Sequence, residues 1–219
     1  VNTAFSCSAT DTGSGVSYMQ YKTPSITSWT TYTSGTSIAT SAANGLYQFR
    51  AVDKAGNISA IRTVTKDTTK PSGTIYGENT AVSSGGSTKA SYIRFAASDA
   101  GAGIDKIYVK KPNTSAYTTY TEGTQFTVNG TYSFYCTDKA GNTSATYTAT
   151  LDNTAPVLSC GQTAFYETTA YDFTVKATDA TSTVTLYYKT PLMTEYAAAS
   201  NGSYSVVTTD SDGRYSFYA

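Results

Sequence analysis

The sequence predicts an all-β protein assembled from small β-sandwiches that follow one another along the chain. Two observations predict this fold class: an internal repeat of constant spacing, and apolar residues that alternate with polar ones. The composition agrees, because 20 tyrosines and 8 phenylalanines suit the pleated surface of a sheet, and charged residues make up only 14% of the 219 positions. We therefore expect almost no helix.

The internal repeat is a motif that occurs twice in full. NGLYQFRAVDKAGNIS at 44–59 returns as NGTYSFYCTDKAGNTS at 129–144, a shift of 85 residues (129 − 44 = 85). DTTKP at 67–71 returns as DNTAP at 152–156 with the same shift (152 − 67 = 85). A third copy begins with DGRYSFYA at 212–219. A unit of about 85 residues is the size of one small β-sandwich.

The spacing predicts three domains: 1–69, which lacks its first strand, 70–154, which is complete, and 155–219, which lacks its last strand. Open sheet edges of this kind invite pairing with another chain. Three explanations compete for the incomplete ends. The chain is an excerpt of a longer array, which we favour, or a stable segment of a native filament, or its gaps are filled by strand exchange between subunits.

Alternation within each copy predicts the strands. In the first copy Phe5, Cys7 and Ala9 are apolar at every second position until Asp11 ends the run, which is the period of a half-buried strand. Residues 47–51 alternate in the same way. The DKAGN string that follows is typical of a tight hairpin turn, in which Gly supplies a positive φ.

The string NG-x-Y-x-F-x-A/C-x-DKAGN, followed by D-T/N-T-x-P, resembles the bacterial immunoglobulin-like (Big-type) domains of surface adhesins and extracellular fibres. The resemblance covers the whole chain and implies tandem Ig-like β-sandwich repeats of about 85 residues, arranged end to end. Tyr47, Tyr132 and Tyr215 occupy the position of the tyrosine corner of Ig-type folds.

The three cysteines fall at positions that are apolar in the other copies. Cys7 aligns with Phe95, and Cys160 aligns with Ile75, so we expect buried, inert thiols. The alternative is a disulfide between Cys136 and Cys160 that crosses a repeat boundary.

Aspartates gather where one predicted repeat joins the next. In an Ig-type sandwich the chain enters at the pole that carries the loops of Asp99 and Asp138, which places the linker residue Asp67 beside them. Oxygen ligands of this kind suit Ca²⁺, and the family supports the idea, since several such arrays rigidify their junctions with calcium. The candidate ligands are Asp67, Asp99, Asp138, Asn142, Asp152 and Asp179. The alternative is that these side chains accept hydrogen bonds from the backbone of their own turns.

Each copy also places an aromatic residue five positions after a proline. These residues are Trp29, Tyr117 and Tyr196, and an exposed aromatic face can stack on a sugar ring. The alternative is that they pack across strands, as aromatic residues commonly do in sheets.

Several classes of function are disfavoured by composition. A formal net charge of zero argues against binding to nucleic acid, and no stretch approaches the ~18 apolar residues of a membrane span. The chain has no histidine, which removes the usual general base and the commonest zinc ligand. We therefore expect no enzymatic activity.

The sequence thus favours a structural spacer or adhesive array of a bacterial extracellular surface protein or filament, located at the cell surface or secreted. Expected partners are neighbouring repeats of the same or identical chains, together with glycans or host-surface proteins. The alternative is a set of carbohydrate-binding accessory repeats in a secreted multidomain enzyme.

Overall fold

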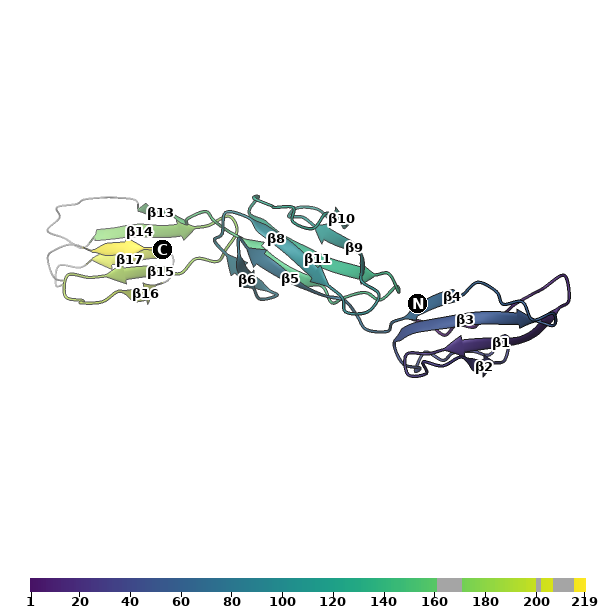
Figure 1. The fold of residues 1–219 in the computed structure, drawn as a ribbon. Helices are drawn as coiled ribbons and strands as arrows, with labels where there is room; N and C mark the ends of the chain where they lie inside the picture. The colour runs from purple at the N-terminus through teal and green to yellow at the C-terminus, as the bar shows by residue number, and fades with distance from the viewer. Residues whose placement is uncertain (161–170, 200–201, 207–214) are drawn as a thin grey trace.

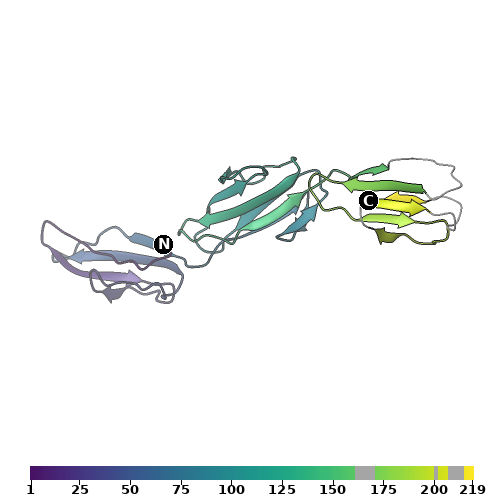
Figure 2. The ribbon, with the colours of Figure 1, turned by 180° about the vertical axis from the view of Figure 1, so that it is seen from behind.

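Strands are the only regular elements in the part of the chain that the computed structural model describes, residues 1–160, 171–199, 202–206 and 215–219. The all-β prediction is therefore confirmed, and these ranges contain no helix that could cross a bilayer. The strands form three successive groups, within 16–66, 72–151 and 157–218, and no sheet assigned there combines strands of two groups. Figures 1 and 2 show the groups following one another along the molecule.

The second group consists of two sheets. A five-stranded sheet has the order β10-β9-β11-β12-β7, and a three-stranded sheet has the order β6-β5-β8. The bounds are β5 Ser72–Gly77, β6 Thr80–Val82, β7 Gly86–Thr88, β8 Ile93–Ser98, β9 Ile104–Lys110, β10 Thr118–Tyr120, β11 Gly130–Asp138 and β12 Tyr147–Leu151. Neighbouring strands are antiparallel, except that β12 and β7 pair in parallel.

One apolar core lies between these two sheets. Alternate residues of β11 point into it, so Tyr132, Phe134 and Cys136 are at most 1% exposed. Phe95 of β8 stacks on Phe134 of the opposite sheet, with ring centroids 4.9 Å apart and planes inclined by 3°. The paired layers and their shared core make this group an immunoglobulin-like β-sandwich.

The first group contains one sheet in the order β2-β1-β3-β4. Its strands are β1 Val16–Lys22, β2 Thr30–Tyr32, β3 Gly45–Asp53 and β4 Arg62–Lys66. Its core is formed by Met19, Tyr32, Tyr47 and Phe49, against which the ring of Phe5 packs edge-on.

The predicted strand at residues 5–9 is where the first group differs from expectation. Only Phe5 forms a β-bridge, to Ile38, although Phe5, Cys7 and Ala9 all pack against the core. The equivalent strand β8 is hydrogen-bonded along its length to β5. No described strand runs beside residues 5–9 in that way, so the alternation directs side chains inward without building a ladder.

The third group has two three-stranded sheets, β13-β14-β17 and β16-β15-β18. Their bounds are β13 Val157–Cys160, β14 Tyr171–Thr178, β15 Leu186–Lys189, β16 Ala197–Ala199, β17 Gly202–Val206 and β18 Ser216–Tyr218. Val175 and Ala177 of β14 pack against Leu186 of β15, so the core of this group contains residues from both sheets. The alternation that predicts a strand in each copy corresponds here to β14, which ends at Thr178, directly before Asp179.

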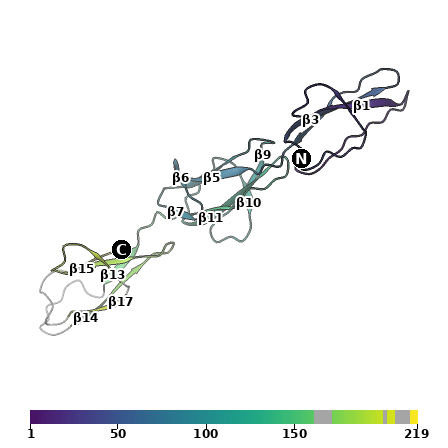
Figure 3. The ribbon, with the colours of Figure 1, turned by 90° about the horizontal axis from the view of Figure 1, so that it is seen from below.

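The repeated motif folds alike in the first two groups. Strands β3 and β11 are each nine residues long and begin 85 positions apart (130 − 45 = 85). The Tyr47 hydroxyl donates to Ala43 O at 2.9 Å, and the Tyr132 hydroxyl donates to Val128 O at 2.8 Å. The tyrosine corner is therefore confirmed twice, while the residues just before Tyr215 lie outside the described ranges. Figure 3 shows the three groups from below. The domain boundaries at 69/70 and 154/155 stay predictions.

The cysteines follow the prediction in part. Cys136 is a buried free thiol, so it forms no disulfide with Cys160 in this structure. Burial raises the pKa of this thiol. Cys7 is half-buried against the core. Cys160 is exposed on β13, so its predicted burial is wrong. The aligned residue Ile75 is covered because β12 packs over β5, whereas the described neighbour of β13 is β14 alone.

Candidate metal centre at the junction

Three aspartates meet where the first group joins the second. Asp67 lies in the linker after β4, Asp99 follows β8, and Asp138 is the last residue of β11. One carboxylate oxygen from each lies within 4.8 Å of the others. Asp67 is 1% exposed and Asp138 is 2% exposed, so two of the three carboxylates are withdrawn from water. The structure thus brings together the residues that the sequence places at this pole.

Asp67 is held by groups of the second sandwich and by its own linker. Its Oδ2 accepts a hydrogen bond from Ala102 N at 2.7 Å, and its Oδ1 accepts one from Thr69 N at 2.9 Å. Its backbone oxygen accepts from Asn142 Nδ2 at 3.0 Å. Burial acts to raise the pKa of Asp67, but the N–H groups of Ala102 and Thr69 outweigh it and hold the pKa below the ordinary value.

The same linker is also held by the first group. Asn44, which precedes β3, accepts hydrogen bonds at its Oδ1 from Thr68 N at 3.1 Å and from Lys66 Nζ at 3.3 Å. Its Nδ2 donates to Asp67 Oδ1 at 3.4 Å and to Thr69 Oγ1 at 3.1 Å. Asp67 is therefore fixed from both sides of the junction.

Asp138 organises the DKAGN hairpin. Its Oδ1 accepts from Ala140 N at 2.9 Å and from Asn142 N at 2.8 Å, and its Oδ2 accepts from Asn142 Nδ2 at 2.7 Å. Gly141 has φ +96° in this turn, a conformation that favours glycine. The hydrogen bonds anticipated for turn aspartates are thus present, and they leave one acceptor site on Oδ2.

Asn142 has a different part from the predicted one. Its Nδ2 donates both to Asp138 and to the backbone of Asp67, so the nitrogen faces the carboxylates. An amide that points its nitrogen at the site cannot coordinate a cation through its oxygen. Asn142 therefore positions two of the acidic residues and is not itself a ligand in this arrangement.

Asp99 supplies the oxygen without a partner. Its Oδ2 accepts from Gly101 N at 3.0 Å and from Gly103 N at 2.7 Å. Its Oδ1 is buried and has no hydrogen-bond partner, which within the described ranges is true of this side-chain atom alone. A buried carboxylate oxygen left in this state is costly, and carboxylates whose oxygens lie within 4.8 Å of one another repel when both are ionised. The donor set fits a hard cation that prefers oxygen.

The second junction has two of the predicted residues. Asp152 Oδ1 accepts from Thr154 N at 3.3 Å, and Asp152 Oδ2 accepts from the hydroxyl of Ser182. Asp179 Oδ1 accepts from Thr181 N at 2.7 Å and from Ser182 N at 2.9 Å, and these bonds lower its pKa. No third carboxylate joins them among the residues that the structure describes.

The three predicted sugar-binding aromatics lie on the outer faces of the sheets, where their own neighbours engage them. The Arg50 guanidinium lies 4.2 Å from the ring centroid of Trp29. Tyr117 packs edge-on against Tyr135 at 4.9 Å, and Tyr196 packs edge-on against Tyr218 at 4.7 Å. The contacts are the cross-strand packing of the alternative interpretation.

Tyr120 and Tyr32, the aromatics three residues further on, are core residues. Tyr120 is 5% exposed, and its hydroxyl accepts from Phe95 N at 3.0 Å and lies 3.0 Å from Thr124 O. It thereby ties β10 of one sheet to β8 of the other. Tyr32 makes the equivalent contact with Cys7 N at 3.0 Å. The sequence contained this signal, since both tyrosines fall at the same place in the repeat.

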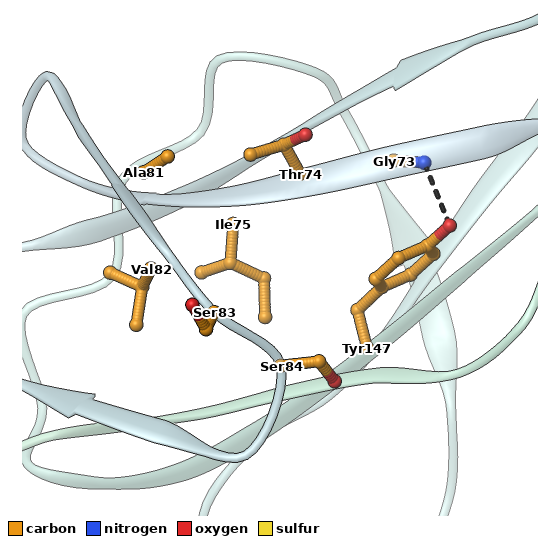
Figure 4. A pocket seen from close by; sticks show the side chains of 8 residues that line it. All are labelled: Gly73, Thr74, Ile75, Ala81, Val82, Ser83, Ser84 and Tyr147. Carbon is orange, nitrogen blue, oxygen red and sulfur yellow. Dashed lines mark hydrogen bonds between the residues drawn. The ribbon is translucent and has the colours of Figure 1, made fainter.

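A groove in the second group offers no reactive centre. The groove lies between the β5–β6 hairpin and β12 and has a volume of about 270 Å³. Figure 4 shows the side chains that line it. Ile75, Val82 and Tyr147 line it, and none of its lining side chains is charged. The Tyr147 hydroxyl accepts from Gly73 N at 3.1 Å, so this polar group serves to close the sandwich.

No protein family matches the chain, and no curated protein matches it. Among solved structures, the chain is similar to the fibronectin(III)-like modules of CbhA from Clostridium thermocellum. The match covers 69% of this chain and 85% of the other, with 18% identity and a TM-score of 0.33.

Proposed function

We propose that this chain is a structural spacer or adhesive array of a bacterial extracellular surface protein or filament, made of tandem Ig-like repeats of about 85 residues. In this proposal the array sets the distance and the direction between whatever lies at its two ends. Its partners are neighbouring repeats and, at the cell surface, glycans or host proteins.

The observation that carries the proposal is the double attachment of Asp67. Asn44 binds the linker from the first group, while Ala102 and Asn142 bind it from the second. Pro71 follows and is buried, which fixes φ and restricts the preceding residue. A linker of this kind limits bending between neighbours, as a spacer requires. A protein that only tethered its domains would need no such attachment.

Small-angle X-ray scattering of the whole chain tests the spacer function. We expect the wild-type chain to scatter as a stiff elongated particle, and Asp67→Ala to give a broader distribution of interatomic distances. Lys70→Ala in the same linker is the matched control, because Lys70 is exposed. If the wild-type chain bends as freely as Asp67→Ala, the spacer proposal fails.

We further propose that Ca²⁺ binds between Asp67, Asp99 and Asp138. The unpartnered Oδ1 of Asp99 and the mutual repulsion of three carboxylates support this site. A cation would satisfy both, and because Asp67 belongs to the linker, it would stiffen the junction. At a concentration 100 times its Kd, a ligand of the folded state stabilises that state by about 2.7 kcal/mol.

Calorimetric melting in EDTA and in millimolar Ca²⁺ tests the metal site. We expect Ca²⁺ to raise the melting temperature of the second group and Asp99→Asn to abolish the rise. Asp11→Asn is the matched control, because Asp11 holds the equivalent turn of the first group through Gly15 N. Identical melting in EDTA and Ca²⁺ would exclude the site.

The proposal includes no catalysis, which the absence of histidine in the sequence supports. The carbohydrate-binding alternative is less well supported, since Trp29, Tyr117 and Tyr196 all engage neighbouring side chains. Trp29 is the single tryptophan, so its fluorescence during titration with host and cell-wall glycans tests the alternative directly.

A further inference from the structure

Two tyrosines face each other on the outer side of the second group. Tyr108 of β9 stands directly opposite Tyr135 of β11 in the antiparallel register. Their ring centroids are 4.7 Å apart, and the ring planes are inclined by 15°. Both side chains are half-buried and lie outside the apolar core of the sandwich. The two phenols are therefore stacked face to face at the surface, where an oxidant in solution can reach them.

The third group contains the same pair at the same place. Tyr187 of β15 stands directly opposite Tyr218 of β18, with ring centroids 4.8 Å apart and ring planes inclined by 9°. Tyr218 is 46% exposed. Because the stack recurs in two groups with nearly the same distance and angle, its geometry belongs to this position of the repeat.

The hydroxyl ends of the stacked rings also lie near each other. Burial raises the pKa of Tyr135, and the neighbouring hydroxyls of Tyr108 and Tyr117 raise it further. The Cε carbons beside the two hydroxyls are therefore neighbours as well. When a phenol loses one electron and its proton, the unpaired electron is shared with these carbons, in orbitals perpendicular to the ring. Parallel rings direct such orbitals at each other, so the reacting atoms are held in position.

We propose that the pairs Tyr108–Tyr135 and Tyr187–Tyr218 are sites of oxidative cross-linking to dityrosine. The co-reactant is a one-electron oxidant, such as a haem that hydrogen peroxide has oxidised. Each ring gives one electron to the oxidant and its phenolic proton to water, and a Cε carbon of one ring then bonds to a Cε carbon of the other. Each of these carbons releases its hydrogen as a proton, and each oxygen regains one. The pair thus loses two hydrogen atoms, and the oxidant gains two electrons.

The bond in the second group joins two central strands of the five-stranded sheet, β9 and β11. It closes a loop of 27 residues (135 − 108 = 27), and like a disulfide it restricts the unfolded chain. The biological use of the bond rests on the proposed spacer function, since a sheet joined covalently across its strands resists pulling. Scattering measures the stiffness of the chain and mass measures the bond, so either idea can fail alone.

The first group is an internal control for this chemistry. Gln20 and Arg50 stand opposite each other at the equivalent register, and Arg50 Nε donates to Gln20 Oε1 at 2.9 Å. The tyrosines in contact in that group are Tyr21 and Tyr32, whose ring planes are inclined by 49°. Tyr32 is 4% exposed and belongs to the core. We therefore expect no dityrosine in the first group.

Oxidation of the whole chain by a haem peroxidase and limiting hydrogen peroxide, in dilute solution, tests the proposal. We expect the monomer to become lighter by two hydrogen atoms for each bond and to gain the fluorescence of dityrosine. The proteolytic map should contain two branched peptides, one for each stacked pair, while Tyr18, which is 45% exposed, stays unlinked. The melting temperature of the second group should rise. Peroxide without the enzyme should form no bond.

Two variants separate the stacked pairs from the other tyrosines. Tyr108→Phe keeps the stacked ring but removes its phenol, so it should lose the branched peptide of the second group and keep that of the third. Tyr21→Phe is the matched control and should keep both. A wild-type chain without branched peptides, cross-links that form mainly between other tyrosines, or a second-group bond that persists in Tyr108→Phe overturns the proposal.

Discussion

Asp67 Oδ2 lies 2.7 Å from Ala102 N, so a residue of the linker is bound to a residue of the second group. The bond joins a linker to the turn that follows β8, 35 residues further along the chain. Neither residue lies in a strand, so the contact comes from the approach of two separately packed bodies. The junction is thus an interface with its own hydrogen bonds, and changes there should affect orientation more than core stability.

Gly101→Ala should disrupt this interface by steric contact. A Cβ at Gly101 would lie 2.1 Å from Asp67 Oδ2, which requires the carboxylate to move and break its bond to Ala102 N. Losing one such buried bond costs about 1–2 kcal/mol. We expect the scattering profile of Gly101→Ala to resemble that of Asp67→Ala.

Gly13→Ala provides the comparison for this steric effect. Gly13 occupies the equivalent turn of the first group, where a Cβ would lie 3.6 Å from the nearest atom of Asp11, an ordinary contact. We therefore expect Gly13→Ala to leave stability and scattering unchanged. Equal effects of the two substitutions would show that the turn, and not the junction, is sensitive to the added methyl group.

Acid should loosen the junction through Asp67. Burial acts to raise the pKa of this carboxyl, but the hydrogen bonds from the N–H groups of Ala102 and Thr69 lower the pKa by more than burial raises it. The folded pKa therefore lies below the unfolded value of about 3.9. A carboxyl of this kind stabilises the fold above its unfolded pKa, and the stabilisation is lost as the pH falls through the folded pKa. We expect scattering to report greater bending below about pH 4. Asp67→Asn should bend at pH 7 and change less on acidification.

The sequence predicts the strands and the approach of the three junction aspartates because both follow from repeated local patterns. Alternation places Phe49 and Phe134 inside, and the repeat places Asp67 at the pole of the next unit. The burial of Lys66 is not predictable in this way, because the mostly polar residues of its strand show no apolar alternation. Its hydrogen-bond partner Asn44 is also distant in sequence.

Contacts between layers and between groups account for the other differences. The sequence predicts Asn142 as an oxygen ligand because it lies in the same turn as Asp138, whereas its orientation depends on the backbone of Asp67, 75 residues away. Cys160 aligns with a buried residue, yet burial depends on a covering strand that alignment cannot supply. The bridge from Tyr120 to Phe95 likewise follows from the spacing of two sheets.

Tyr120→Phe should destabilise the second group more than Tyr132→Phe. The Tyr132 hydroxyl makes one bond, to Val128 O, and removing it costs about 1 kcal/mol. The Tyr120 hydroxyl accepts the Phe95 N–H in the core, so its removal leaves a buried donor unsatisfied at a cost of about 1–3 kcal/mol. Chemical denaturation of both variants measures the difference, with the half-buried Tyr135→Phe as a control of little effect. A larger loss for Tyr132→Phe would contradict the assignment of Tyr120 as the bridge between sheets.

Gly73→Ala should show how tightly the sandwich closes. A Cβ at Gly73 would lie 2.0 Å from Phe95 Cζ, and that ring is already stacked on Phe134 at 4.9 Å. The ring cannot retreat without disturbing the opposite sheet, so we expect a loss of about 1–3 kcal/mol in unfolding free energy from overpacking. The double variant Gly73→Ala with Phe95→Leu should lose less unfolding free energy than the two single variants lose in sum, because the smaller side chain leaves room for the methyl group. Strictly additive losses in denaturant unfolding would mean that the backbone at Gly73, and not the ring of Phe95, absorbs the substitution.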